Sequence, residues 1–156
     1  MKKFKLILLI LLSINIYANE TNFDNIIKTA KEQNKQIMVF FHMEHCPWCH
    51  KFINESLSDK KIQNMINKDF IFVSLDVETE GTITYQNKKM DKIDFARKYE
   101  VYFYPTTLIF NNMEIVYRIR GYRNKPKFIN IINYTANKAY KSMTLKEFIV
   151  NQEFNK

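Results

Sequence analysis

Hydrophobic residues along the chain recur at two spacings, one helical and one extended. Apolar side chains at helical intervals predict an amphipathic first helix that contains Phe23, Ile26, Ile27 and Ala30. The short, partly β-branched apolar run 36–41 predicts a central strand, and a helix to about residue 56 should follow it. A further helix that starts at Ser58-Asp59 precedes a second buried strand over 70–75. We therefore expect parallel strands joined by helical crossovers.

The middle of the chain is more polar than the segments around it. In residues 79–90, Ile83 and Tyr85 alternate with polar residues before the turn-like pair Gln86-Asn87, which predicts a small hairpin insertion. Another helix should follow this insertion, because apolar residues return at helical spacing at Ile93, Ala96 and Tyr99.

A second hairpin is predicted further along the chain. The apolar runs 107–110 and 115–119 read as strands, and the pair Asn111-Asn112 between them reads as a turn. Two strands joined by so short a turn must be antiparallel. Gly121 ends this hairpin. The complete order of elements therefore predicts an α/β fold in which helices flank a mixed sheet.

Two helices are expected at the end of the sequence. The first begins near Pro126 and carries apolar residues at helical spacing, namely Phe128, Ile129, Ile132, Ala136 and Ala139. The segment 144–147 is a capping box, with threonine first and glutamate last, and predicts the start of the second helix. Phe148 and Ile149 are its expected docking residues. Residues 141–156 should therefore form a C-terminal helical extension.

The N-terminus has the pattern of a secretory signal peptide. Lysines precede the apolar run 6–12, and a short segment ending in Ala18 follows it. The apolar run is too short to span a bilayer. We expect cleavage after Ala18, export to the bacterial periplasm and no stable membrane insertion of residues 19–156, which suffice for one domain but not two. An uncleaved signal that acts as a membrane tether is the alternative for segment 1–18.

The charge pattern of the chain argues against nucleic acid as a partner. The formal net charge of +8 includes three lysines of the predicted signal segment, and the other basic residues are interspersed with acidic ones. Such a pattern favours a solvated lysine-rich surface over nucleic-acid binding. An acidic protein partner remains open.

The two cysteines of the chain, Cys46 and Cys49, enclose Pro47 and Trp48 directly after the first predicted strand. This placement puts both thiols on the first turn of a helix, where unpaired N–H groups and the helix dipole lower the pKa of a thiol from about 8.5 to roughly 3.5–7.5. Cys46 is the expected nucleophile and Cys49 the resolving cysteine of a redox-active disulfide. Pro47 suits the first helical position, and Trp48 should give an apolar contact beside the sulfur.

Three other interpretations of the cysteine pair are open. An inert structural disulfide is one, although so short a loop gives little entropic stabilisation. Because His50 follows Cys49, the segment also fits the attachment signature of c-type haem. The apolar strand directly before the cysteines argues against haem, and zinc bound through His42, His45 and the thiols is disfavoured because these ligands need not converge. His45 is instead expected to tune the thiolate of Cys46, with a solvated loop histidine as the alternative.

In its order of elements and its cysteine motif, the sequence resembles the thioredoxin superfamily over roughly residues 22–140. The specific marks are the strand–Cys46–Cys49–helix unit and Tyr104-Pro105-Thr106 before the second hairpin. The resemblance implies a thioredoxin-like fold with a cis-proline at Pro105 that lies against the cysteines. It also implies that the backbone of Tyr104 pairs with an extended substrate.

Within the superfamily, the chain looks like the exported thioredoxin-related proteins of the SoxW type. These share an insertion after the second core strand, here 79–90, and a Gly-Tyr pair after the hairpin, here Gly121-Tyr122. This resemblance implies a thiol-disulfide oxidoreductase without cofactor or metal that reduces protein disulfides and is kept reduced by a membrane electron donor. A non-catalytic thioredoxin-fold binding module is the alternative.

One position departs from the family pattern. Many thioredoxins carry a buried acid on the strand before the active site, and Phe40 stands at that place. Proton transfer to Cys49 must then use water or another group. The direction of the redox reaction stays open, because the span of about 150 mV between reducing and oxidising members depends on how well the Cys46 thiolate is stabilised.

Overall fold

The computed structural model describes residues 20–154, so the predicted signal segment 1–18 lies outside the described residues. The main sheet has four strands in the order β3-β2-β6-β7. Their bounds are β2 Gln36–His42, β3 Phe70–Asp76, β6 Thr106–Asn111 and β7 Glu114–Arg120. Strand β2 is parallel to β3 and antiparallel to β6, which is in turn antiparallel to β7. The predicted mixed sheet is confirmed.

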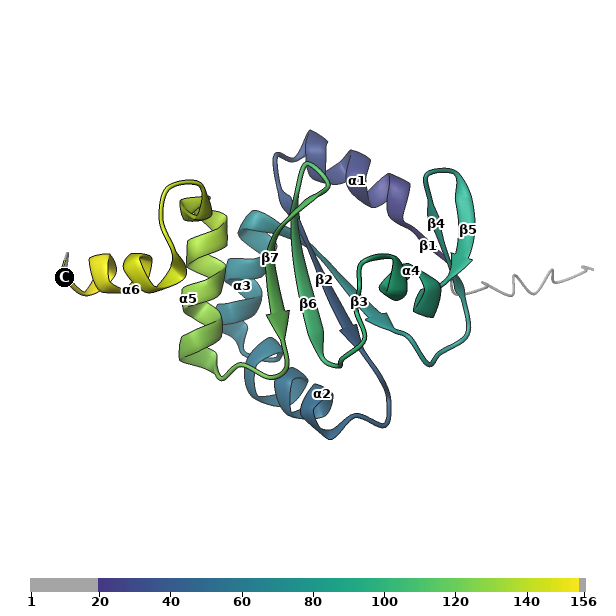
Figure 1. Ribbon diagram of the computed structural model, residues 1–156, viewed down its shortest axis with the longest axis horizontal. Coiled ribbons are helices and arrows are strands. Elements are labelled where there is room, and N and C mark those ends of the chain that lie inside the picture. The colour runs from purple at the N-terminus through teal and green to yellow at the C-terminus, as the bar shows by residue number, and fades with distance from the viewer. Residues whose placement is uncertain (1–19, 155–156) are drawn as a thin grey trace, which may run out of the picture.

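Helices cover both faces of this sheet (Figure 1). They are α1 (Phe23–Glu32), α2 (Pro47–Phe52), α3 (Lys60–Asp69), α4 (Lys92–Lys98), α5 (Lys125–Ala136) and α6 (Leu145–Phe154), with a π-helical turn η1 (Ile53–Leu57) and a 3₁₀ turn η2 (Ala139–Lys141). The pattern of β2 explains this division, because successive side chains of a strand point to opposite faces. Val39 and Phe41 pack with α1 and α4, whereas Met38 and Phe40 pack with α2, α3 and α5.

The predicted insertion forms a small second sheet. Strand β4 (Thr82–Tyr85) pairs antiparallel with β5 (Lys88–Asp91), and the two-residue strand β1 (Thr21–Asn22) pairs parallel with β4. Gln86 and Asn87 form the turn, as expected, and both have left-handed conformations. Ile83 and Tyr85 are buried in the core that α1 and α4 share with the main sheet. The insertion is therefore packed into the fold, and β1 is an addition that the sequence did not predict.

Three details differ from the sequence-based expectations. Strand β3 is an edge strand with one face only partly covered: Phe70 is buried there, but Phe72 on the same face is 37% exposed, although a buried strand was expected. The second hairpin turns at Asn112 and Met113, both at positive φ, because Asn111 still pairs with Glu114. Helix α5 ends at Ala136, and the expected helical residue Ala139 lies in η2.

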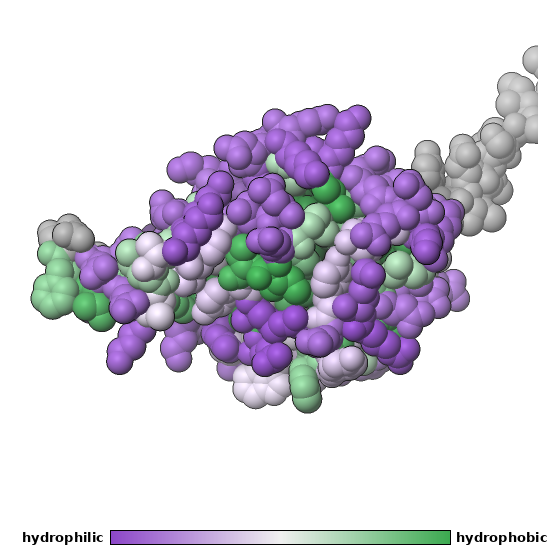
Figure 2. All heavy atoms as spheres, turned by 45° about the horizontal axis from the view of Figure 1, so that its top comes forward, coloured by the Kyte–Doolittle hydropathy of each residue, from purple (hydrophilic) through white to green (hydrophobic). Residues whose placement is uncertain are grey.

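The capping box at the C-terminal helix is confirmed. The backbone N–H of Thr144 donates to a Glu147 carboxylate oxygen at 2.7 Å, and the Glu147 N–H donates to Thr144 Oγ1 at 3.3 Å. Phe148 packs edge-on against Tyr134 of α5, with ring centroids 5.6 Å apart. Figure 2 shows apolar side chains at the tip of α6, where Phe154 is exposed. Within residues 20–154, every helix is too short or too polar to cross a membrane.

Candidate redox site

The topology brings four connecting segments to one edge of the main sheet. Parallel strands β2 and β3 end at this edge, and the antiparallel partner strand β6 begins there, with β7 returning to it. The segments 43–46, 77–81, 103–105 and 121–123 therefore lie at the same edge, which is next to α2 at the bottom of Figure 1. We call it the redox edge.

The cysteine pair lies at the start of α2. Cys46 is the N-cap residue of this helix, and the Cys49 N–H donates to Cys46 Sγ at 3.1 Å. The backbone N–H groups of Cys49 and His50 also donate to the Cys46 carbonyl, at 3.0 and 3.1 Å. Pro47 occupies the first helical position, where a backbone N–H would have no partner. The expected placement of both sulfurs on the first turn is confirmed.

Cys46 and Cys49 form a disulfide with their Cα atoms 5.2 Å apart. Their accessibility differs, because Cys49 is 1% exposed and Cys46 is only partly buried. In such a pair, only the more exposed sulfur can meet a sulfur of another protein. The arrangement fits the predicted roles of Cys46 as nucleophile and Cys49 as resolving cysteine.

The segment before β6 has the predicted proline geometry. The Tyr104–Pro105 peptide bond is cis, and the Pro105 carbonyl accepts a hydrogen bond from the Gly121 N–H at 2.8 Å. Thr106 pairs with Phe41 in β2, and its hydroxyl donates to the Phe103 carbonyl at 2.7 Å. Residues 104 and 105 thus lead into β6, which begins at Thr106 at the redox edge. Burial raises the pKa of the Tyr104 hydroxyl, which lacks a hydrogen-bond partner within residues 20–154.

An aromatic cluster covers the outer side of α2. Trp48 is 57% exposed, and its ring lies 6.1 Å from the ring of Tyr122. The amine of Lys51 is 5.3 Å from the Trp48 ring centroid and 5.0 Å from that of Tyr122. Tyr122 also packs edge-on against Phe52, which anchors α2 in the core. The sequence singled out Gly121-Tyr122 only as a family mark and did not place Tyr122 on the cysteine helix.

Two hydrogen bonds join the π-helical turn η1, which follows α2, to residues after β7. The Tyr122 hydroxyl donates to the Glu55 carboxylate, and this negative partner raises the pKa of Tyr122. The Ser56 hydroxyl donates to the Arg123 carbonyl at 2.9 Å. Both contacts join residues 67 positions apart, so local spacing in the sequence carries no signal for them.

The three histidines near the cysteines have separate partners. His45 Nδ1 lies 3.5 Å from a Glu78 carboxylate oxygen, and His42 Nε2 lies 2.9 Å from the Ser74 hydroxyl. The His50 ring contacts the carbonyl of Glu44. Burial lowers the pKa of His42. Within residues 20–154, no group of three histidine, cysteine or acidic side chains is arranged to hold a metal ion.

The position beneath α2 that is acidic in many thioredoxins is apolar in this chain. Phe40 is buried, packs edge-on against Phe52 with centroids 5.5 Å apart, and stacks on His42. No carboxylate can therefore act from residue 40 on Cys49.

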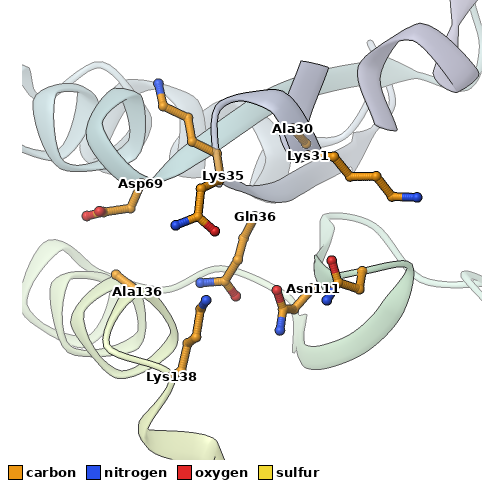
Figure 3. Close-up of a pocket in the computed structure, with 10 residues that line it drawn as sticks. Ala30, Lys31, Lys35, Gln36, Asp69, Asn111, Ala136 and Lys138 are labelled. Carbon is orange, nitrogen blue, oxygen red and sulfur yellow. The ribbon is translucent and has the colours of Figure 1, made fainter. Parts of the chain in front are cut away.

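A polar cavity of about 300 Å³ lies at the opposite edge of the sheet (Figure 3). Lys35, Gln36, Asn111 and Lys138 are among its lining residues, and the Gln36 side chain points into it. Gln36 is 4% exposed, and its Nε2 donates to the Thr135 carbonyl at 2.8 Å. Its Oε1 has no partner within residues 20–154. This cavity shares no lining residue with the redox edge.

Comparison with known proteins agrees with this geometry. The family model described as "Thioredoxin-like domain" matches residues 23–136, so the chain belongs to the thioredoxin-like domain family. A thioredoxin from Thermus thermophilus has a similar structure, with 24% identity, a TM-score of 0.59, and coverage of 74% of this chain and 85% of that one. A thioredoxin-fold protein from Helicobacter pylori gives a TM-score of 0.65 at 17% identity, covering 78% and 86%.

One curated relative matches a shorter stretch. Anterior gradient protein 3 of Mus musculus is 38% identical over 50 residues, which are 32% of this chain and 30% of that protein. The chain therefore spans less than a third of the length of this relative. The family, the fold and the disulfide of Cys46 and Cys49 together support thiol-disulfide oxidoreductase chemistry.

Proposed function

We propose that the protein is an exported thiol-disulfide oxidoreductase that reduces disulfides of other proteins. The observation that carries this proposal is the Cys46–Cys49 disulfide at the start of α2, with one sulfur accessible and the other buried. The signal-like pattern of residues 1–18 supports export, with the periplasm as the compartment. The reducing direction follows from the resemblance to exported thioredoxin-related proteins of the SoxW type.

The reaction begins with the reduced protein, in which Cys46 is a thiolate. Its sulfur attacks one sulfur of the substrate disulfide, forms a mixed disulfide and releases the other substrate sulfur as a thiolate, which takes up a proton. Cys49 then loses its proton and attacks Cys46, which forms the Cys46–Cys49 disulfide and releases the second substrate thiol. Two electrons pass from the dithiol to the substrate. A membrane dithiol donor restores the reduced protein by the same exchange.

The start of α2 assists this reaction by electrostatics. The Cys49 N–H already donates to Cys46 Sγ in the disulfide, and the helix N-terminus favours negative charge at that atom. The backbone at Tyr104 beside Pro105 is our candidate for pairing with an extended substrate, and exposed Trp48 for apolar contact with it. With Phe40 in place of an acid, the proton of Cys49 leaves through water or another group.

Insulin-disulfide reduction tests the proposal. The wild-type protein, supplied with dithiothreitol, should accelerate insulin precipitation, and the Cys46→Ser variant should not. The Cys49→Ser variant should accumulate a mixed disulfide with its substrate, because the resolving thiol is missing. A non-catalytic binding module would show no cysteine-dependent turnover, and covalently bound haem with a Soret band in the purified protein would contradict the redox assignment.

A further inference from the structure

We propose that Glu78 is a positioning residue that sets the redox equilibrium of the cysteine pair, because its carboxylate holds the backbone next to Cys46 and places a negative charge there. This inference rests on the proposed function. Glu78 belongs to the segment after β3 and lies 32 positions after Cys46, so no local pattern in the sequence connects them.

The contact is made to the residue that precedes the nucleophile. The His45 backbone N–H donates to Glu78 Oε2 at 3.3 Å, and the same oxygen lies 3.5 Å from His45 Nδ1. The His45 ring is 85% exposed, so water solvates most of it, whereas the backbone contact fixes the carboxylate beside the first residues of the cysteine motif. Glu78 is therefore held at the residue directly before Cys46.

Several bonds hold the segment that carries Glu78. The Val77 N–H donates to the His42 carbonyl at 3.0 Å, which continues the pairing of β3 with β2. The Glu78 N–H donates to Asp76 Oδ1 at 3.0 Å. The amine of Lys92, a residue only 6% exposed, donates to Thr79 Oγ1 at 2.8 Å and to the Glu80 carbonyl at 3.1 Å. The carboxylate thus sits on an anchored segment and not on a free loop.

The electrostatic consequence has a definite sign. The reduced protein carries a thiolate at Cys46, and the disulfide carries no charge there. A fixed carboxylate nearby disfavours the thiolate and so disfavours the reduced protein relative to the disulfide. The helix N-terminus acts in the opposite sense. Glu78 therefore makes the dithiol a stronger reductant, in agreement with the proposed reducing direction.

The Glu78→Gln variant tests the charge separately from the contact. Glutamine retains a side-chain oxygen that can accept from the His45 N–H, but it is uncharged. The protein is equilibrated with glutathione at pH 8, the free thiols are alkylated, and mass spectrometry gives the ratio of reduced to oxidised protein. The equilibrium constant for oxidation by glutathione disulfide should fall about two- to fivefold in the variant. The alkylation of Cys46 should also reach its half-maximal rate at a lower pH.

Glu44→Gln is the matched control. Glu44 lies two positions before Cys46, and its carboxylate makes no hydrogen bond or ion pair within residues 20–154. Removing this solvated charge should change the equilibrium constant by less than half as much. An unchanged constant in Glu78→Gln, or an equal change in Glu44→Gln, would overturn the inference. The equilibrium with glutathione can be measured even if the protein does not reduce insulin. The test therefore distinguishes a failure of the proposed function from a failure of the proposed effect of Glu78.

Discussion

The redox edge and the opposite edge of the main sheet differ in how their connecting segments turn. At the redox edge, polar contacts join segments far apart in sequence, such as His45 to Glu78 and Ser56 to Arg123. At the opposite edge, turns form around residues in left-handed conformations, and Gln36 beside the polar cavity donates to the Thr135 carbonyl while its buried Oε1 has no partner in residues 20–154. Long-range polar contacts thus hold both edges, and the edges differ in their backbone, because only the opposite edge turns through non-glycine residues at positive φ.

The largest effect should come from the apolar anchor of the redox edge. Phe52 is fully buried under α2 and contacts Phe40, Tyr122 and Phe128, so Phe52→Ala should lower the free energy of unfolding by about 3–5 kcal/mol. Urea denaturation measures this change. The matched control is Phe72→Ala on the edge strand β3, where the loss should be about 1 kcal/mol or less. Equal losses would mean that α2 is not anchored through Phe52.

Removal of the buried amine that holds the segment around Glu78 should have a smaller effect. Lys92→Met leaves the Glu80 carbonyl and Thr79 without their donor, and should lower the free energy of unfolding by about 1 kcal/mol. Amide hydrogen exchange at His45 should become faster, because Glu78 is held less firmly. In Lys89→Met, which removes an exposed amine paired with Glu20, exchange at His45 should stay as in the wild type.

At the opposite edge, a substitution that changes only the conformational preference of the backbone should change the stability of the protein. Lys138 has φ 54°, a left-handed conformation that glycine adopts without steric cost. Lys138→Gly should therefore raise the free energy of unfolding by about 0.5–1 kcal/mol and leave insulin reduction unchanged. Lys138→Ala keeps a Cβ atom and should give no such gain. A similar gain in both variants would assign the effect to the lysine amine.

The smallest effect concerns pH. Burial lowers the pKa of His42, Asp76 opposes this shift, and His50 and Lys92 reinforce it. Below the ordinary pKa of about 6.5 the unfolded chain takes up a proton that the folded protein resists, so this contribution to stability is complete above that pH and is lost as the pH falls. His42→Gln should show a smaller loss of stability between pH 7.5 and pH 5. An identical loss would assign the dependence to other groups.

Much of the fold follows from local signals in the sequence. The apolar run of β2, the capping box at Thr144 and Glu147 and the pair Gln86-Asn87 each act within a few residues, and each is found where it was expected. The cysteine motif is equally local, because Cys46 caps the helix that contains Cys49. The cis bond before Pro105 came from the family resemblance and not from spacing.

The remaining features depend on the order of strands in space. Phe72 looks like a core residue in the sequence, and only the position of β3 at the edge of the sheet leaves it exposed. The contact of Glu78 joins two loops that meet because four strand ends share one edge, and the contact of Tyr122 joins one of these loops to η1. No pattern within a window of ten or twenty residues contains that information, so the supporting residues of the site could not be predicted.

The unequal exposure of the two sulfurs also governs how partners share the protein. Cys49 is buried in the core, so an incoming sulfur can reach the pair only at the more exposed Cys46. In the proposed function, a substrate and an electron donor would compete for this single point of attachment and would have to visit it in turn. Such alternation is ping-pong kinetics, in which the first partner leaves before the second arrives.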